Sequence, residues 1–271
     1  MDGPQLEQFG RTAERLMSDR FFVALSSLRS RAWRAFRRVG PVGLGWLLIM
    51  NIKLLVTGRY REHHHAYDRS FDRKYGVDTA GTVALEELRA SDDLKRHARR
   101  YEAADPEFFT FLLQRAGFSG HSDHLFVDLG SGKGRSLLLA ALAGFSRVVG
   151  VELDPELDRV ARRNIEIFKR QHPLADFIAV NGDATTFEFP PVPTLLFLNN
   201  PFDEHLLDKV LANVEGVHCG PATDFTLIYM HSNHGDLVRR RTGWEELDHG
   251  TFRSRRLFYG IFRWRGAERL V

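Results

Sequence analysis

A glycine-rich turn near the middle of the chain is the segment best suited to bind a ligand. Residues 127–135 have the sequence Val-Asp-Leu-Gly-Ser-Gly-Lys-Gly-Arg and follow an apolar run. Glycines in such a turn allow positive φ and let backbone N–H groups approach a ligand closely. Gly134 after Lys133 departs from the GxxxxGK[ST] loop of nucleotide triphosphatases, and Arg135 occupies the third glycine position of the dinucleotide pattern GxGxxG. The GxGxG spacing therefore suits a ligand with a short amino-acid tail at the turn and a ribose beside it.

Further polar positions follow the later apolar runs. Glu152 lies 20 residues beyond Gly132, where a carboxylate can accept hydrogen bonds from both ribose hydroxyls. Asp183, next to Ala184 in a small Gly-Asp-Ala turn, can accept a hydrogen bond from an adenine amino group. The fourth apolar run ends at Asn-Asn-Pro-Phe, residues 199–202. Because ligands bind at the carboxyl ends of strands in open α/β sheets, these positions together predict a nucleoside pocket.

The elements that must position these residues follow a regular alternation. Apolar runs that suit buried strands alternate with helix signals, which is typical of a parallel sheet with crossover helices. Asp105-Pro106 and Asp154-Pro155 each predict a helix start, with an acidic N-cap and proline at the first helical position. The expected strands are 125–129, 147–151, 177–180, 194–198 and 225–230, with a hairpin in 244–264 and further helices over 136–143 and 204–214.

In order and spacing, these segments resemble the class I, seven-stranded S-adenosylmethionine-dependent methyltransferases. The resemblance covers about residues 101–264 and rests on VDLGSGKGR, VVGVELDP, NGDA and FLNNPF. It implies an α/β fold: a Rossmann-like three-layer sandwich whose mostly parallel seven-stranded sheet ends in a C-terminal antiparallel hairpin. It also implies S-adenosyl-L-methionine as the cofactor, with Glu152 at the ribose and Asp183 and Ala184 at the adenine. The positions that it assigns to the methionine moiety are Asp128, Gly130, Ser131, Gly132 and Gly134.

The FLNNPF segment indicates what kind of atom is methylated. It is similar to the [DN]PP[YF] motif of enzymes that methylate planar amino nitrogens, with Asn200 in place of the first proline. It is also similar to the NNFAF segment of the non-SET, telomeric-silencing type of histone lysine methyltransferase, from which Pro201 departs. We expect the preceding strand to deliver Asn199 beside the cofactor. Asn199, a predicted cofactor-binding residue, is then expected to line the acceptor pocket with Asn200 and Phe202, and Tyr101 is expected to act as a lid.

Methyl transfer makes modest demands on the protein. The sulfonium is an activated donor, so the protein must mainly align a nucleophile with the methyl group and exclude water. An amine acceptor must be neutral, which a low-dielectric pocket with amide acceptors favours. We predict catalytic roles for Asn200, Phe202 and Tyr101. The alternatives are a strand-ending turn and a packing aromatic, and His231 and His234 are weaker candidates to bind the substrate or act as a base.

The N-terminal 60 residues differ in charge from the rest of the chain. They carry a net charge of +6, whereas residues 61–271 carry −3. From about residue 11 to residue 38, apolar side chains recur at helical spacing between arginines, and 42–56 is a second apolar stretch. A membrane span needs about 20 mostly apolar residues. We therefore expect helices docked on protein, with peripheral membrane contact through residues 11–57 as the alternative.

Composition limits the class of protein and its compartment. The chain has 271 residues, 43% hydrophobic and 27% charged, which excludes wholesale disorder. The single Cys219 excludes an intrachain disulfide and a thiolate zinc site, and the run His63-His64-His65 suits a solvated turn, so no metal is expected. We expect a helical extension (1–60), a connector and active-site lid (61–103) and a methyltransferase domain (104–271). The expected location is cytoplasmic, with the inner face of a membrane as the peripheral alternative.

These patterns predict an S-adenosylmethionine-dependent N-methyltransferase that acts on a protein lysine. Methylation of a small molecule or a nucleobase is the alternative within enzymes. The net-acidic main body and the lack of a recognisable target-recognition domain argue against sequence-specific duplex DNA as a partner. A non-catalytic cofactor-binding or membrane-associated adaptor is the alternative of another class, against which the cofactor motifs argue.

Overall fold

The computed structural model describes residues 69–83, 101–118, 122–217, 224–252 and 257–266. The predictions for the N-terminal extension, the histidine run and Cys219 fall on residues outside these ranges. Within the described ranges, no helix combines the length and the apolar character that crossing a membrane requires.

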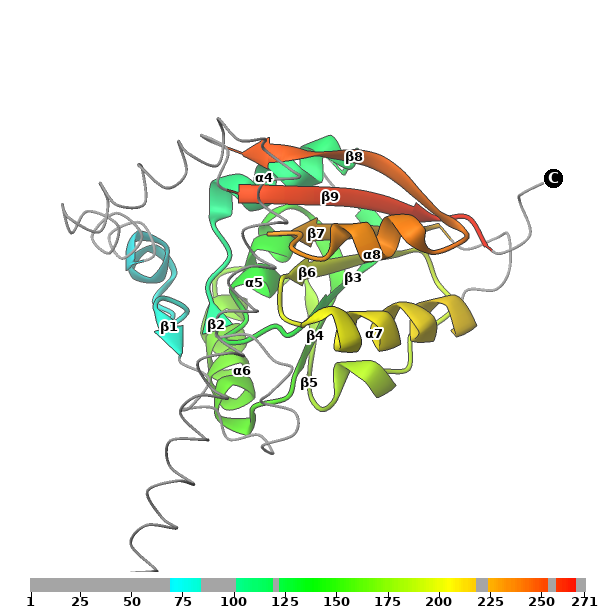
Figure 1. The fold of residues 1–271 in the computed structure, drawn as a ribbon. Coiled ribbons are helices and arrows are strands. Elements are labelled where there is room, and N and C mark those ends of the chain that lie inside the picture. The colour runs from blue at the N-terminus through cyan, green and yellow to red at the C-terminus, as the bar shows by residue number, and fades with distance from the viewer. Residues whose placement is uncertain (1–68, 84–100, 119–121, 218–223, 253–256, 267–271) are drawn as a thin grey trace, which may run out of the picture. The chain divides into compact units, whose positions relative to one another are not determined.

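A seven-stranded mixed sheet lies at the centre of the domain (Figure 1). Its strand order is β5-β4-β3-β6-β7-β9-β8, in which β3 to β7 are parallel and the β8–β9 hairpin is antiparallel. This arrangement confirms the expected Rossmann-like sheet and its C-terminal hairpin. The strands are β3 (Ser122–Leu129), β4 (Phe145–Glu152), β5 (Asp176–Asn181), β6 (Thr194–Asn199), β7 (Phe225–Met230), β8 (Trp244–Phe252) and β9 (Leu257–Trp264).

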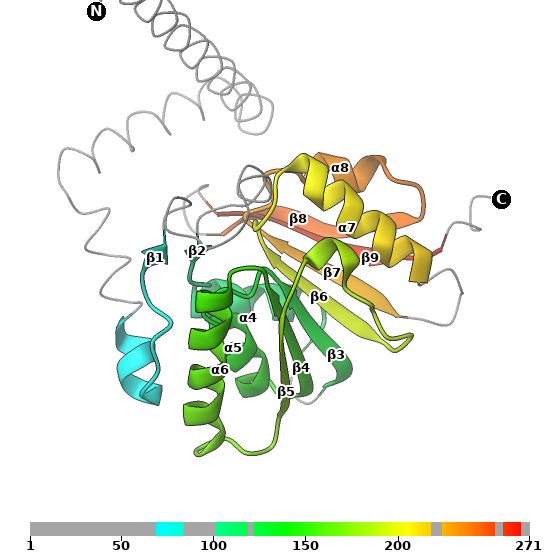
Figure 2. The same cartoon turned by 90° about the horizontal axis from the view of Figure 1, so that it is seen from below.

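Helices cover both faces of this sheet, which gives three layers (Figure 2). The first face is covered by α4 (Pro106–Arg115), α5 (Arg135–Leu142) and α6 (Pro155–Lys169), and the second by η2 (Ala184–Thr186), α7 (Glu204–Val217) and α8 (Gly235–Arg240). Residues 69–75 are also helical, and β1 (Thr82–Val83) pairs with β2 (Tyr101–Glu102). The carboxylates of Asp105 and Asp154 each accept hydrogen bonds from two backbone N–H groups, which confirms the predicted helix starts. The sequence analysis did not predict η2 or α8.

The central strands are apolar on both faces because both faces are buried. On β3, Phe126 packs with the cluster beneath α4 and α5, whereas the next residue, Val127, packs with the cluster beneath α7. Phe109 of α4 joins the first cluster to the sheet: its ring centroid lies 5.9 Å from that of Phe126 and 5.1 Å from that of Phe197. The continuous apolar runs of the sequence therefore mark strands with helices on either side.

The segment 69–83, expected as part of a polar connector, shares the core of the domain. Phe71, Tyr75 and Val77 are buried in the cluster that includes Phe168 of α6. The rings of Tyr75 and Phe168 have centroids 5.5 Å apart. Phe71 and Tyr75 are four residues apart, which places both side chains on one face of a helix. This spacing was the sequence signal that could have predicted their burial. The segment is thereby held close to the carboxyl ends of the strands.

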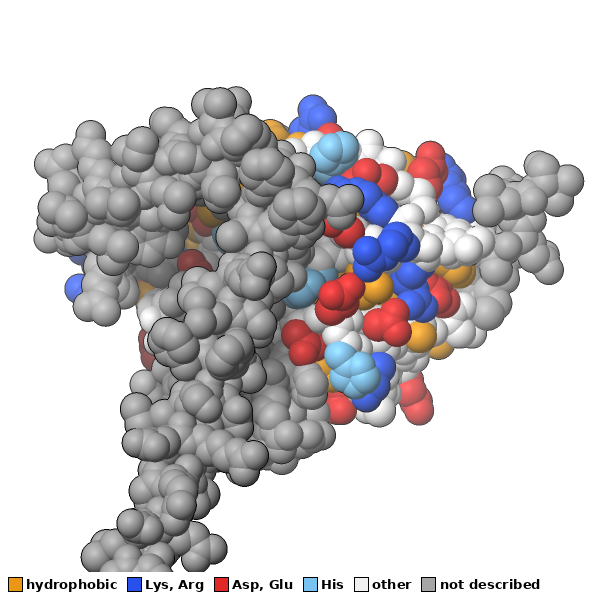
Figure 3. Space-filling model, in the orientation of Figure 1, with side chains coloured by type: hydrophobic (Ala, Val, Ile, Leu, Met, Phe, Trp, Pro, Cys, Tyr) orange, Lys and Arg blue, Asp and Glu red, His pale blue; other side chains and the backbone are white. Residues whose placement is uncertain are grey.

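Acidic and basic side chains are intermixed on the described part of the face shown in Figure 3. Arg241, after α8, forms ion pairs with Asp208 and Glu215 of α7. Arg239 pairs with Glu246 at 2.5 Å. Such partly exposed pairs contribute little to stability individually, but they neutralise the arginines locally.

We expect Phe109→Ala to lower the free energy of unfolding by about 3–5 kcal/mol, because it removes a fully buried ring and leaves a cavity between α4 and the sheet. Leu174→Ala is the control, because Leu174 is 89% exposed, and we expect a change within about 0.5 kcal/mol. Urea denaturation measures both. Equal midpoints for the two variants would contradict the packing described above.

Candidate active site

The predicted ligand-binding residues gather where the strand order reverses. From β3 the chain proceeds through β4 to β5 on one side, whereas β6 and β7 lie on the other side. Such a reversal opens a crevice at the carboxyl ends of the two central strands. Tyr101, Asp128, Gly130, Ser131 and Asn199, all singled out from the sequence, line one pocket here. The other residues that line it are Glu102, Ala104, Arg135 and Ser136.

The glycine loop between β3 and α5 needs its glycines for two separate reasons. Gly130, Gly132 and Gly134 all have positive φ, at 84°, 55° and 83°. A Cβ atom on Gly130 would lie 2.5 Å from Cβ of Pro201, and one on Gly132 would lie 2.1 Å from Cδ2 of Tyr101. The loop therefore packs against the segment after β6 on one side and against the Tyr101 ring on the other.

Glu152, at the end of β4, holds this loop in place. Its Oε2 accepts the backbone N–H of Gly132 at 2.7 Å, and its Oε1 accepts that of Asp154 at 2.9 Å. Burial raises the pKa of Glu152 to about 7, against the opposing effect of these backbone hydrogen bonds. A carboxylate oxygen can accept more than one hydrogen bond. Glu152 can therefore hold the loop and accept from ribose hydroxyls as well.

Asp128 is a buried acid that uses one of its two carboxylate oxygens in a hydrogen bond to a described residue. Its Oδ2 accepts a hydrogen bond from the Ser136 hydroxyl, while Oδ1 is buried and has no hydrogen-bond partner among the described residues. Burial raises the pKa of Asp128 to about 7, and the charge of Glu152 adds to this effect. An unsatisfied buried acceptor is costly. Because Asp128 lines the pocket, a cationic donor such as an amino-acid ammonium group would satisfy it.

Asp183 and Ala184 lie beside Glu152 but outside this pocket. Gly182 N–H donates to the backbone carbonyl of Glu152 at 3.0 Å, which places their turn next to the end of β4. Oδ1 of Asp183 accepts from both the backbone N–H and the hydroxyl of Thr185, each at 2.8 Å, and so caps η2. Ala184 is buried in the cluster beneath α7. Their roles toward adenine stay predictions.

The two asparagines after β6 have different surroundings. Nδ2 of Asn199 donates to the backbone carbonyl of Glu102 at 2.9 Å, and its Oδ1 is buried with no hydrogen-bond partner among the described residues. Asn200 has a left-handed φ of 50°, and its Oδ1 accepts from the Tyr229 hydroxyl at 3.1 Å. Phe202 is buried in the cluster beneath α7. Of the segment 199–202, Asn199 is the residue that lines the pocket.

The two candidate histidines lie after β7, outside the residues that line the pocket. His231 has a left-handed φ of 55°, and its ring packs edge-on against Phe108 with centroids 5.8 Å apart. His234 is buried and occupies the N-cap position of α8. His234 is therefore not a solvated loop side chain. Their predicted roles toward the substrate stay predictions.

Comparison with known proteins supports what the fold and the loop indicate. Residues 97–189, which contain the glycine loop and Glu152, match the family model described as Histone methylation protein DOT1. The chain carries a class I S-adenosylmethionine-dependent methyltransferase domain. The pocket of this methyltransferase domain fits its methyl donor, S-adenosylmethionine, because Asp128 lines it and the buried Oδ1 of Asp128, which has no hydrogen-bond partner among the described residues, can accept from an ammonium group.

The methyltransferase domain is also similar to individual proteins. Over 58 residues it is 40% identical to the ribosomal protein L11 methyltransferase of Geobacter sp. (strain M21), a match that covers 20% of this chain and 19% of that protein. The match therefore spans about a fifth of the length of this curated relative. Among solved structures, the 23S rRNA methyltransferase ErmE has a TM-score of 0.42 at 20% identity and covers 60% of this chain and 70% of its own. TrmN from Thermus thermophilus has a TM-score of 0.45 at 17% identity and covers 59% and 49%.

Sequence reasoning missed Ser136 and Arg135, both of which line the pocket of the methyltransferase domain. They are the first two residues of α5. First-turn side chains of a helix that follows a strand lie near the carboxyl edge of the sheet, and this was the signal that could have found them. Thr79 and Asp72, the partners of Arg135, lie too far away along the chain for a spacing argument to name them.

We expect Gly132→Ala to weaken binding of S-adenosylhomocysteine by about tenfold or more, because alanine is strained at positive φ by about 1–2 kcal/mol and its Cβ would displace the Tyr101 ring. Gly117→Ala is a matched control, since Gly117 has a φ of 82° with nothing within 4 Å of the added Cβ. Calorimetric titration should give wild-type affinity for the control. Wild-type affinity in Gly132→Ala would contradict the assignment of this loop.

We expect binding of S-adenosylhomocysteine to release protons near pH 7 and to tighten as the pH rises from about 6 to about 8. Asp128 and Glu152, with pKa values raised to about 7, are mostly protonated at the lower end of this range and ionised at the upper end. The ammonium group and ribose hydroxyls of the ligand are donors that favour the ionised carboxylates.

Calorimetry in buffers with different ionisation enthalpies counts the released protons. Glu152→Gln should release fewer protons than the wild type, because one titrating carboxyl group is gone. Proton uptake on binding would show that the sign of this coupling is wrong.

Proposed function

We propose that this protein transfers a methyl group from S-adenosylmethionine to an amine nitrogen, and that the acceptor is a lysine side chain of a protein. The observation that carries the proposal is the buried Oδ1 of Asn199, which has no hydrogen-bond partner among the described residues, on a residue that lines the same pocket as Asp128. An amide oxygen beside the cofactor loop, in addition to the Asp128 carboxylate, suits a nucleophile that carries N–H groups.

The cofactor half of the site consists of groups that complement each part of the donor. Asp128 pairs with its ammonium group, and Glu152 accepts from its ribose hydroxyls. Gly130 and Ser131 of the loop line the pocket, and its amino-acid tail lies against them. The bound cofactor supplies a methyl group that its sulfonium has already activated.

The acceptor half of the site depends on a fixed amide. The hydrogen bond from Asn199 Nδ2 to the Glu102 carbonyl sets which way the amide lies, and this leaves its oxygen for an incoming amine. An oxygen that accepts one amine N–H directs the nitrogen lone pair elsewhere, toward the methyl carbon in the geometry that we propose. The buried surroundings lower the pKa of the amine, so that it enters the reaction neutral.

A protein acceptor is favoured by the two sequence matches. The family model is one of histone methylation, and the relative from Geobacter is named for methylation of ribosomal protein L11. Both names describe methyl transfer to protein. The pocket residues discussed above fall inside or next to the segment that matches the family model, apart from Asn199.

The experiment that tests this function incubates the full-length protein with S-adenosylmethionine labelled in its methyl group and an extract of cells that lack the protein. We expect label in protein, recovered as methyl-lysine after hydrolysis. Label in RNA or in the small-molecule fraction would overturn the lysine assignment while keeping methyl transfer. No transfer of label to any fraction, with S-adenosylhomocysteine bound, would favour the adaptor.

We expect Asn199→Ala to lower the single-turnover rate by about 10²-fold, because misplacement of an acceptor by about 1 Å can cost that much. Affinity for S-adenosylhomocysteine should change little, because Asp128 and Glu152 hold that ligand. A quenched time course with labelled cofactor, after calorimetry of the same variant, checks both. A wild-type rate would remove Asn199 from the acceptor site.

We also expect Asn200→Ala to keep cofactor binding and to lower the single-turnover rate, since Asn200 is proposed to shape the acceptor wall. Tyr229→Phe is the matched control, because it removes the hydroxyl that donates to Asn200 Oδ1 and leaves a buried ring of the same shape. Equal small losses in the two variants would reduce Asn200 to a turn residue.

A further inference from the structure

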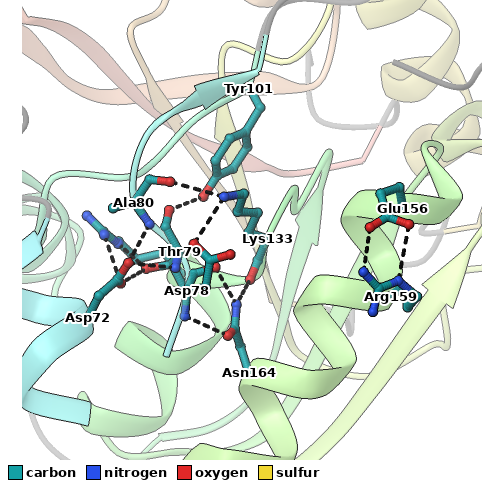
Figure 4. Close-up of polar contacts among 10 residues, drawn as sticks. Asp72, Asp78, Thr79, Ala80, Tyr101, Lys133, Glu156, Arg159 and Asn164 are labelled. Atoms are coloured by element: carbon teal, nitrogen blue, oxygen red, sulfur yellow. Dashed lines mark hydrogen bonds and ion pairs between the residues drawn. The ribbon is translucent and has the colours of Figure 1, made fainter. Parts of the chain in front are cut away.

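A buried polar network connects the cofactor loop to the segment 72–80 (Figure 4). It begins at Arg135, the residue directly after the loop, which is 1% exposed. Nε of Arg135 donates to the Thr79 hydroxyl at 2.6 Å, and Nη2 donates to Asp72 Oδ1 at 3.2 Å. The guanidinium also lies over the ring of Phe71, 5.0 Å from its centroid. A buried ion pair is weak evidence of a gain in stability, so this one calls for another explanation.

Asp72 uses both carboxylate oxygens to fix the position of Thr79. Oδ2 accepts the backbone N–H groups of Thr79 and Ala80 at 2.8 and 2.7 Å. Oδ1 accepts the Thr79 hydroxyl at 2.6 Å in addition to Arg135. Thr79 is fully buried. Its backbone and its side chain are therefore both set by Asp72.

The network returns to the cofactor loop through Tyr101. The Tyr101 hydroxyl donates to the backbone carbonyl of Thr79 at 2.6 Å. The same Tyr101 ring packs on Gly132, where an added Cβ would meet it. Both ends of the network thus reach the pocket, because Tyr101 and Arg135 each line it.

A second set of contacts holds the same segment against the loop and α6. Lys133 Nζ donates to the Ala80 carbonyl and to Asp78 Oδ1, each at 3.2 Å. Asn164 of α6 accepts the Asp78 N–H at 2.8 Å and donates to the carbonyls of Asp78 and Lys133, both at 2.9 Å. These bonds hold the segment in place but do not reach Tyr101 themselves. Asp72 and Thr79 are the link that does.

We propose that Asp72 is a positioning residue for cofactor binding. Together with Arg135 it fixes Thr79, and the Thr79 carbonyl holds the Tyr101 ring as a wall of the pocket over the glycine loop. The proposal rests on the proposed function in that S-adenosylmethionine is the ligand of this loop. Asp72 lies outside the residues that line the pocket, so its effect on the ligand passes through Tyr101.

The test is a double-mutant cycle on the full-length protein, with S-adenosylhomocysteine as the probe. Asp72→Asn replaces one acceptor oxygen with a donor that cannot accept from an N–H or hydroxyl group, and Tyr101→Phe removes only the hydroxyl. We expect each variant to weaken binding by about tenfold, the size of one lost hydrogen bond to a fixed group. In the double variant the loss should stay close to that of one single variant, because both changes break the same chain of contacts.

Glu215→Gln is the control for a loss of stability alone. Glu215 Oε2 forms a partly buried ion pair with Arg241 at 2.5 Å. Glu215 belongs to α7, which covers the opposite face of the sheet from Asp72. We expect this variant to lower the melting temperature and to keep wild-type affinity. Should Asp72→Asn fail to fold, Thr79→Val takes its place, because it removes the hydroxyl contact to Asp72 and Arg135 with little change of shape.

In the binding experiments, two results would overturn the proposal. The first is wild-type affinity of Asp72→Asn for S-adenosylhomocysteine despite a lower melting temperature. The second is a double variant in which the two losses of affinity multiply. Hydrogen exchange without ligand gives a separate reading, since amides of residues 101–104 should exchange faster in Asp72→Asn and not in Glu215→Gln. Unchanged exchange there would also overturn it. A wild-type protein that does not bind S-adenosylhomocysteine would instead refute the proposed function.

Discussion

The hydrogen bond from the Gly132 N–H to the Glu152 carboxylate is the interaction on which the site depends. It ties the loop after β3 to the end of β4, and so it joins the two strands that flank the proposed cofactor position. Gly132 can offer this N–H because its positive φ turns the backbone toward Glu152, and because no Cβ separates it from Tyr101. The glycine is therefore required by two contacts at once.

The burial that makes this bond strong also places two acids in an environment that disfavours their charge. The pKa values of Asp128 and Glu152 are both raised to about 7, chiefly by desolvation. Perturbed carboxylates of this kind are common at functional sites. Of the two, Asp128 lines the pocket, and its Oδ1 has no hydrogen-bond partner among the described residues, so a ligand with a cationic donor would satisfy it. The same argument applies to the proposed acceptor site, where the oxygen of Asn199 lacks a partner among the described residues.

The segment 69–83 helps to enclose a site that lies at the ends of the strands. The sheet supplies the loop and the acids, but strand ends alone leave the pocket open to solvent. The helix 69–75 anchors the segment through Phe71 and Tyr75 in the core. Asp72, on the same helix, then directs its polar contacts toward Thr79 and toward Arg135, which lines the pocket. Apolar and polar faces of one short helix thus have separate tasks.

The sequence by itself determined the parts of this protein that depend on local pattern. The apolar runs and the two Asp-Pro helix starts predicted the order of strands and helices along the chain, and the GxGxG spacing predicted a tight glycine turn, because periodicity, capping and glycine conformation are properties of neighbouring residues. Only the tertiary structure decided which polar groups meet. It gave Asn200 a partner in Tyr229 and left Asn199 facing the pocket, and it paired Arg135 with Asp72 across 63 positions of the chain. Such pairs form because packing brings distant segments together around a buried charge. The spacing of residues along the sequence does not predict which distant segments meet.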